Sequence, residues 1–291
     1  MTIDHAKCVE TILKKITVKP KLIGFHGQTI YHDPKKKVSY QAGDSKLLFN
    51  MLQIPVVSNF RDNDILNGGQ GAPIAPIYHK YLIQKLNISL PACFLNIGGI
   101  CNITYWDGKE LIGFDTGPGN ALMDTYSQKK LSLRYDKDGL IASLGKPNLN
   151  KIQKILNHDF FNKMYPKSLD KNEFNFFIDI ISKNESSHEN ILATLSELTA
   201  YSVQSGLEIL PKKPKSLTLM GGGSKNLHLV KNFKKIVKTK IYTAEDFKLD
   251  SEMIEAELIA FLAARSYYGL PTTYPNTTGV PIPISTGKIY T

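Results

Sequence analysis

Three short glycine-rich segments each follow an apolar run in this chain of 291 residues, at 97–99 (IGG), 115–119 (DTGPG) and 220–223 (MGGG). Glycine directly after a buried strand lets the backbone approach a ligand closely, and its N–H groups can surround an anion. A tight turn explains one such segment equally well. Three of them, together with Asp115 and Asn102, indicate a site for nucleotide phosphates. Neither the P-loop pattern nor the dinucleotide pattern fits any of them.

Asp115 ends the apolar run 111–114 (LIGF). A carboxylate at a strand end is partly desolvated and lies beside backbone amides, which suits a general base or a Mg²⁺ contact. The alternative is a capping role at the start of the next helix.

Other polar side chains follow the strands predicted at 21–25 and 55–59. His26 and Gln28 follow the first strand, and Arg61 follows the second. Arg61 could bind a carboxylate or phosphate through two parallel N–H bonds, or it could pair with Asp62 or Asp64. Glu255 lies in a predicted helix over 252–267, where a solvated face is the default expectation.

The order of elements predicts an α/β fold. Strands at 92–97, 102–106 and 111–114 form a meander, and the strands at 216–220 and 240–243 alternate with helices. This order suggests an RNase-H-like lobe repeated imperfectly in each half. We expect lobes at 1–125 and 126–291, and a Pro- and Thr-rich tail from Gly269 that wraps the surface.

Composition narrows the class of protein. The net charge is +10, but the lysines form scattered clusters without interleaved arginine or aromatic residues, so we expect a solvated surface and no nucleic-acid partner. No apolar run reaches the roughly 20 residues that span a bilayer, and no secretion signal opens the chain, so we expect a cytoplasmic protein without a membrane partner. The three cysteines do not form metal-type pairs.

Taken together, several motifs resemble the anhydro-N-acetylmuramic acid kinases, which are bacterial sugar kinases of the actin-like (hexokinase/Hsp70) superfamily. The motifs that carry the resemblance span nearly the whole chain in order: IGFHGQT (23–29), QAGD (41–44), VVSNFRDNDILNGGQGAPIAP (56–76), LNIGGICNIT (95–104), GFDTGPGNALMD (113–124), YDKDG (135–139), PKSLDKNEF (166–174), GGGSKN (221–226), EAELIAFLA (255–263) and GLPTTYPNTTG (269–279).

The resemblance implies a reaction in peptidoglycan recycling. ATP with Mg²⁺ phosphorylates O6 of 1,6-anhydro-N-acetylmuramic acid while water opens the anhydro bridge at C1, which gives N-acetylmuramic acid 6-phosphate. Asp115 matches the family's base for that water. The family is usually dimeric, which implies a possible homodimer.

The resemblance also distributes the binding residues. Arg61 and Glu255 fall where the family contacts sugar, and His26, Gln28 and Gln70 complete the predicted substrate-binding set. The predicted nucleotide-binding set contains seven residues: Gly98, Gly99, Asn102, Gly117, Gly221, Gly222 and Gly223.

One departure concerns the start of the chain. The family opens with a phosphate loop of the type GxMSGTSxDG, which is not found in this sequence. We therefore expect an actin-like fold whose first lobe is truncated at its N-terminus. The alternative function is a catalytically impaired remnant, or half of a split kinase, that binds sugar or a partner without turnover.

Overall fold

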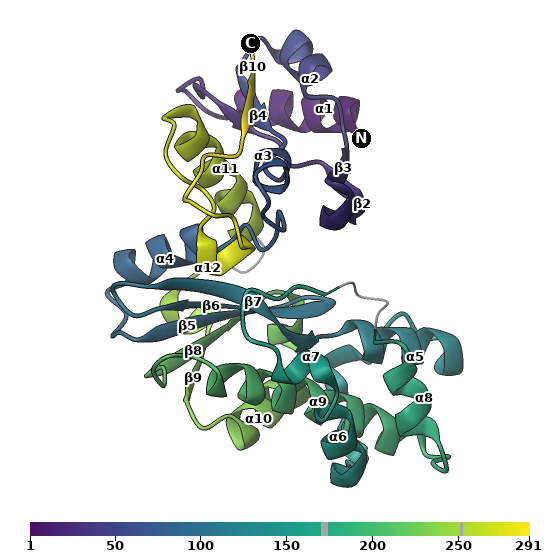
Figure 1. Cartoon of the computed structure of the whole chain (residues 1–291). Helices are drawn as coiled ribbons and strands as arrows, with labels where there is room; N and C mark the ends of the chain where they lie inside the picture. The colour runs from purple at the N-terminus through teal and green to yellow at the C-terminus, as the bar shows by residue number, and fades with distance from the viewer. Residues whose placement is uncertain (170–173, 251–252) are drawn as a thin grey trace. The chain divides into compact units, whose positions relative to one another are not determined.

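The computed structural model describes residues 1–169, 174–250 and 253–291 and divides into two compact units (Figure 1). The first unit combines Met1–Tyr78 with Met253–Thr291, and the second contains His79–Glu252. The predicted boundary after residue 125 falls inside the second unit, because strands before that point pair with strands after it. The predicted α/β class is confirmed. Among the described residues, no helix has the length and apolar character needed to cross a membrane.

The second unit is built on a five-stranded sheet of order β7-β6-β5-β8-β9. Its strands are β5 (Ala92–Ile97), β6 (Ile100–Trp106), β7 (Leu111–Pro118), β8 (Ser216–Met220) and β9 (Lys240–Thr243). β6 runs antiparallel to β5 and β7, whereas β5, β8 and β9 are parallel. This is the strand order of an RNase-H-like lobe, and it contains the predicted meander.

Alternation along these strands separates a core face from a second face. Leu95, Ile103 and Phe114 are fully buried in the main hydrophobic core, which also contains residues of α9. Phe94 and Thr104 point to the opposite face, where His79 packs against the ring of Phe94 and its Nδ1 lies 2.7 Å from Thr104 Oγ1. The sheet is therefore covered on both sides, as its almost continuously apolar strands require.

Most helices of the second unit lie between β7 and β8 in the chain, and α10 lies between β8 and β9. They are α5 (Ala121–Leu131), α6 (Leu149–Leu156), α7 (Asp159–Asn162), α8 (Phe176–Ser182), α9 (His188–Glu208) and α10 (Leu227–Ile236). Short 3-10 turns lie at Lys137–Gly139, Ala142–Leu144, Gly222–Lys225 and Ala244–Phe247. Ser187 accepts the Asn190 N–H at 3.1 Å and so fixes the start of α9, the longest of these helices.

The first unit has a small sheet of order β1-β4-β10 and a separate hairpin of β2 and β3. Its elements are α1 (Thr2–Leu13), β1 (Ile23–Gly24), β2 (Gln28–Asp33), a 3-10 turn (Pro34–Lys36), β3 (Val38–Ala42), α2 (Ser45–Leu52), β4 (Val56–Ser58), α3 (Asp62–Leu66), α11 (Ile254–Tyr267), α12 (Pro275–Thr278) and β10 (Lys288–Tyr290). The helix α4 (Pro76–Lys85) contains the boundary between the units.

One expectation for the first unit differs from the structure, and another falls partly outside the described residues. The tail was expected to wrap the surface, but its last residues form β10, which pairs antiparallel with β4. The helix expected over 252–267 is described from residue 254, and residue 252 lies outside the described residues. Residues 170–173 of the motif at 166–174 also lie outside them.

A buried carboxylate fixes the glycine-rich loop at 68–71 and the tail. Asp64 is fully buried, and its side chain accepts hydrogen bonds from the Gly71 N–H and the Thr278 hydroxyl, both at 2.6 Å. A side chain on Gly69 would lie 2.1 Å from Asp64 Oδ1, so only glycine allows this close approach. The Gln70 N–H donates to the Thr278 carbonyl at 2.7 Å and closes the arrangement.

We expect Asp64→Ala to lower the free energy of unfolding by about 3 kcal/mol or more, because two buried donors lose a charged acceptor. Asp62→Ala on the same helix is the matched control, since half-buried Asp62 accepts one side-chain hydrogen bond, from Asn59 at 2.6 Å. Denaturant unfolding of both variants measures the difference. Equal losses in the two variants would contradict a central role for Asp64.

Candidate functional site

The three glycine-rich segments meet at one edge of the five-stranded sheet. β5, β7 and β8 run in the same direction, so their carboxyl ends share an edge (Figure 1). The Gly119 N–H donates to the Gly99 carbonyl at 2.9 Å, and the Asn120 N–H donates to the Gly98 carbonyl at 2.8 Å. The structure therefore brings together the segments that the sequence singled out separately.

Three of the predicted glycines are required by packing. A side chain on Gly117 would lie 2.7 Å from Ser202 Oγ, and one on Gly223 would lie 2.2 Å from Ile97 Cγ2. Gly221 has φ +79°, and a side chain there would lie 2.4 Å from Asn96 Oδ1. The fold alone accounts for glycine at these positions.

The other three glycines have no such requirement. A side chain on Gly222 would have no atom within 4 Å. The nearest atom to a side chain on Gly98 would be the Ile100 carbonyl oxygen at 3.6 Å, and the nearest to one on Gly99 would be Ala121 Cβ at 3.5 Å. Gly99 and Gly222 are exposed, and Gly98 is half-buried. Packing therefore does not explain these three glycines, and a ligand could approach the backbone closely there.

A polar row crosses the sheet just before this edge. Asn96, Asn102 and Asp115 are register partners on β5, β6 and β7, and all three are half-buried. Directly opposed residues on neighbouring strands point to the same face. Asn102 therefore lies beside Asp115, and its role in binding the nucleotide stays a prediction. Asn96 was not in that set, although it precedes the first glycine segment by one residue.

Asp115 is held by the segment that follows α7. The Leu169 N–H donates to Asp115 Oδ2 at 2.8 Å, and the Asp115 N–H donates to the Lys167 carbonyl at 2.9 Å. Burial raises the pKa of Asp115 to about 7, although the Leu169 N–H and the charge of Lys167 act in the opposite direction. The carboxyl group is thus poised to exchange a proton near neutral pH, as a general base must. The N-cap position of α5 is Asn120, and within the described residues no side chain caps this helix.

Lys167 is the cation whose charge acts on Asp115, and it was not among the predicted site residues. The residue is buried, and its Nζ donates to the Phe160 carbonyl at 3.1 Å and lies 4.7 Å from the centre of the Phe160 ring. Burial lowers the pKa of Lys167 to about 8, while the nearby Asp115 raises it. A lysine in the motif at 166–174 was visible in the sequence, but only folding shows that it is buried beside the carboxylate.

In the first unit, three predicted sugar residues line one cavity of about 510 Å³, which we call the arginine pocket. Arg61, His26 and Glu255 lie in its wall. Arg61 Nε donates to His26 Nε2 at 3.2 Å, and Arg61 Nη1 donates to the Gly71 carbonyl at 2.7 Å. Within the described residues Arg61 forms no ion pair with Asp62 or Asp64, which were its alternative partners.

Burial and charge set the protonation of this pair. Burial lowers the pKa of Arg61 to about 10, so the guanidinium stays charged at neutral pH. Burial and the charge of Arg61 both lower the pKa of His26, so the imidazole is neutral and can accept the bond from Arg61 Nε. The pocket therefore presents a fixed positive charge to an anionic ligand.

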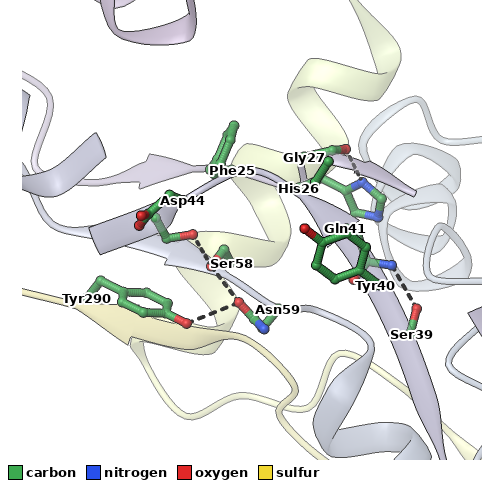
Figure 2. A pocket seen from close by; sticks show the side chains of 13 residues that line it. Phe25, His26, Gly27, Ser39, Tyr40, Gln41, Asp44, Ser58, Asn59 and Tyr290 are labelled. Atoms are coloured by element: carbon green, nitrogen blue, oxygen red, sulfur yellow. Dashed lines mark hydrogen bonds between the residues drawn. The ribbon is translucent and has the colours of Figure 1, made fainter. Parts of the chain in front are cut away.

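A second cavity of about 420 Å³ shares His26 with the arginine pocket, and we call it the Tyr290 pocket (Figure 2). Figure 2 shows the Tyr290 hydroxyl directed at Asn59, to whose Oδ1 it donates at 3.2 Å. Ser58 donates to the same oxygen at 2.9 Å. Tyr290 was not among the predicted site residues, and it reaches this wall only because β10 pairs with β4.

Two predicted sugar residues lie outside both cavities. Gln28 is exposed at the start of β2, and Gln70 belongs to the loop that Asp64 fixes. The prediction that they bind substrate stays a prediction.

A further cavity in the second unit, of about 330 Å³, lies along α5, and we call it the α5 pocket. Gly222 and Gly223 line it together with Asn120 and Asp124. Asp124 was not predicted as a site residue, although it ends the motif at 113–124. Within the described ranges, no group of three or more His, Cys, Asp or Glu side chains could hold a metal ion.

The strand order defines an α/β protein with an RNase-H-like lobe. Comparison with known proteins identifies the family. A family model described as anhydro-N-acetylmuramic acid kinase matches residues 1–291, and the chain belongs to this family. An anhydro-N-acetylmuramic acid kinase from Rhodopseudomonas palustris (strain ATCC BAA-98 / CGA009) is 38% identical over 99% of this chain and 79% of its own length. One from Pelagibacter ubique (strain HTCC1062) is 40% identical over 97% of this chain and 77% of its own length.

Solved structures show only a weak likeness. A ROK family glucokinase from Streptomyces griseus in complex with glucose and AMPPNP is 10% identical, with a TM-score of 0.41 over 90% of this chain and 87% of that one. A ROK family protein from Streptococcus pneumoniae TIGR4 in complex with sucrose is 12% identical, with a TM-score of 0.37 over 91% and 87%. At these TM-scores the likenesses carry no argument about the site.

The raised pKa of Asp115 makes a prediction about stability. A carboxyl group whose pKa rises on folding holds its proton more tightly in the folded state, so its contribution to stability falls as pH rises from about 4 to about 7. We expect Asp115→Asn to raise the free energy of unfolding at pH 8 by about 2 kcal/mol and to change it little at pH 4. This is about half of what the full rise in the pKa of Asp115 would give, because the group is partly exposed.

Asp107→Asn is the control of opposite sign. The N–H groups of Glu110 and Lys109 lower the pKa of Asp107, so its contribution to stability is present at pH 8 and is lost as pH falls. The amide should therefore destabilise the protein at pH 8. Denaturant unfolding of both variants at pH 4 and pH 8 tests the prediction. If Asp115→Asn destabilised the protein at pH 8, the raised pKa of Asp115 would be refuted.

The difference between glycines required by packing and glycines in open positions can be tested by substitution. We expect Gly117→Ala to lower the free energy of unfolding by about 2 kcal/mol, because the methyl group meets Ser202. Gly222→Ala should change it by less than about 0.5 kcal/mol, since the position is open. Thermal and denaturant unfolding compare the two. A large loss in Gly222→Ala would show that packing, rather than ligand approach, requires this glycine.

Proposed function

We propose that this protein is an ATP-dependent kinase of 1,6-anhydro-N-acetylmuramic acid that couples phosphorylation of O6 to opening of the anhydro bridge and forms N-acetylmuramic acid 6-phosphate. The observation that carries the proposal is the family match over residues 1–291. The gathering of Arg61, His26 and Glu255 around one cavity supports it.

We assign recognition of the sugar's lactyl carboxylate to Arg61. Within the described part of the chain, Arg61 donates through Nε and Nη1, and Nη2 donates no hydrogen bond. A guanidinium held in place by two bonds loses little side-chain entropy when it binds a carboxylate. His26 and Glu255 border the same cavity. The Glu255 carboxylate suits the hydroxyl and acetamido N–H groups of the sugar, while His26 holds Arg61 in place.

We assign the role of general base to Asp115. The carboxylate takes a proton from water as the water oxygen bonds to C1, and the bond between C1 and O6 breaks. O6 then takes the γ-phosphoryl group, and ADP is left. A pKa of about 7 suits both halves of this proton transfer, because the group is partly ionised at neutral pH and can release the proton afterwards.

We assign the nucleotide phosphates to the glycine edge, with Gly98, Gly99 and Gly222 as the positions open to close approach. Mg²⁺ usually binds substrate phosphates with only one or two protein carboxylates, so the reaction needs no dedicated cluster of ligands. Bound Mg²⁺ would neutralise charge on the phosphates. We further propose a cytoplasmic protein, without a nucleic-acid or membrane partner, that forms a homodimer.

The proposal is tested by incubating the full chain with the anhydro sugar and ATP-Mg²⁺ and following both ADP and the 6-phosphate. We expect Asp115→Asn to lower kcat by about 10² to 10⁴ with sugar affinity retained. Arg61→Met should raise the KM for sugar about 10- to 100-fold and leave the KM for ATP unchanged, because only the sugar contact is lost.

Arg134→Met is the charge-matched control, since Arg134 is exposed and lines neither cavity of the first unit. A folded protein that binds sugar but gives no 6-phosphate would refute the kinase assignment and leave the non-catalytic remnant as the better description.

A further inference from the structure

Asp124 carries an unused carboxylate in the α5 pocket. The residue is half-buried, and its side chain forms no hydrogen bond or ion pair with any residue that the structure describes. Burial raises the pKa of Asp124 to about 6. A desolvated carboxylate that faces a cavity without a partner destabilises the folded chain, and such groups concentrate at functional sites.

Two other carboxylates line this pocket, and each of them is stabilised by hydrogen bonds or by solvent. Asp136 is buried and accepts the N–H groups of Ile141 and Ala142, both at 2.9 Å. Asp138 is exposed to solvent. Asp124 alone among the three combines partial burial with the lack of a partner in the described chain.

The position of Asp124 along α5 indicates what it could meet. The Asp124 N–H donates to the Asn120 carbonyl at 2.9 Å, which places it one helical turn after the loop whose N–H groups reach Gly98 and Gly99. One turn advances by about 5.4 Å, roughly the step from the α-phosphate to the ribose of a nucleotide. A carboxylate beside the phosphates would repel them, whereas beside the ribose it meets two hydroxyl donors.

We propose that Asp124 accepts hydrogen bonds from the ribose hydroxyls of the bound nucleotide and makes the α5 pocket select ribonucleotides over deoxyribonucleotides. The inference rests on the proposed use of ATP and adds a specificity-determining residue to it. The same chemistry is used in dinucleotide-binding folds, where an acidic side chain binds the ribose 2′-hydroxyl. The neighbouring Gly222 gives the nucleotide room because the space around it is open.

The test is calorimetric binding of ADP, 2′-deoxy-ADP, 3′-deoxy-ADP and inosine diphosphate to the full chain, to Asp124→Asn and to Asp138→Asn. We expect the wild-type protein to bind ADP about tenfold more tightly than either deoxy analogue. Asp124→Asn should weaken ADP about tenfold, leave the deoxy analogues almost unchanged and abolish the discrimination. Asp138→Asn should keep the wild-type ratios, because Asp138 is exposed.

Other outcomes separate this inference from the proposed function. Equal weakening of all four nucleotides in Asp124→Asn would show a structural role and overturn the inference. Loss of discrimination only between ADP and inosine diphosphate would place the carboxylate at the base and overturn it too. Nucleotide binding with the expected ratios but without sugar phosphorylation would refute the kinase and leave Asp124 as the ribose residue. No nucleotide binding at all would refute both.

Discussion

The parallel pairing of β5 with β8 is the constraint on which the second unit depends. It joins residues 92–96 to residues 216–220, and the register places Asn96 opposite Met220 at the end of both strands. Only because these strands end together do the glycines after β5 meet the glycines after β8. The close approach of Gly221 to Asn96, and of Gly223 to Ile97, is a direct consequence. At this edge Gly99 and Gly222 stay exposed, whereas Gly117 and Gly223 are buried.

The same sheet determines the chemistry of Asp115. β7 carries the carboxylate to the polar row with Asn102, and the segment at 167–169 covers it from outside the sheet. Burial favours the neutral acid, while the buried Lys167 and the Leu169 N–H favour the anion. The balance of these opposing contributions, rather than any one of them, keeps the group near the pH at which proton transfer is useful.

Several features of the fold followed from residue types, whereas the sugar-binding roles of Arg61 and Glu255 were predicted from the resemblance to the family. Short apolar runs separated by turns predicted the meander that is observed as β5, β6 and β7. The arginine pocket contains Arg61, His26 and Glu255, which were chosen from separate motifs. The structure groups residues on both sides of the expected division at residue 125, because the meander pairs with β8 across the helices between them. Tyr290 was missed for the same reason, since three residues at the chain end form a strand only against β4.

By itself, the sequence determined which positions could do chemistry: a carboxylate after an apolar strand, three glycine segments, and an arginine beside a glycine-rich loop. Local patterns suffice there, because glycine and strand-end polar residues have strong backbone preferences. Only the tertiary structure decided which glycines serve packing and which stay open. It alone buried Lys167 beside Asp115 and left Asp124 without a partner in the described chain. Burial and partner geometry arise from contacts between distant segments, and no local pattern contains them.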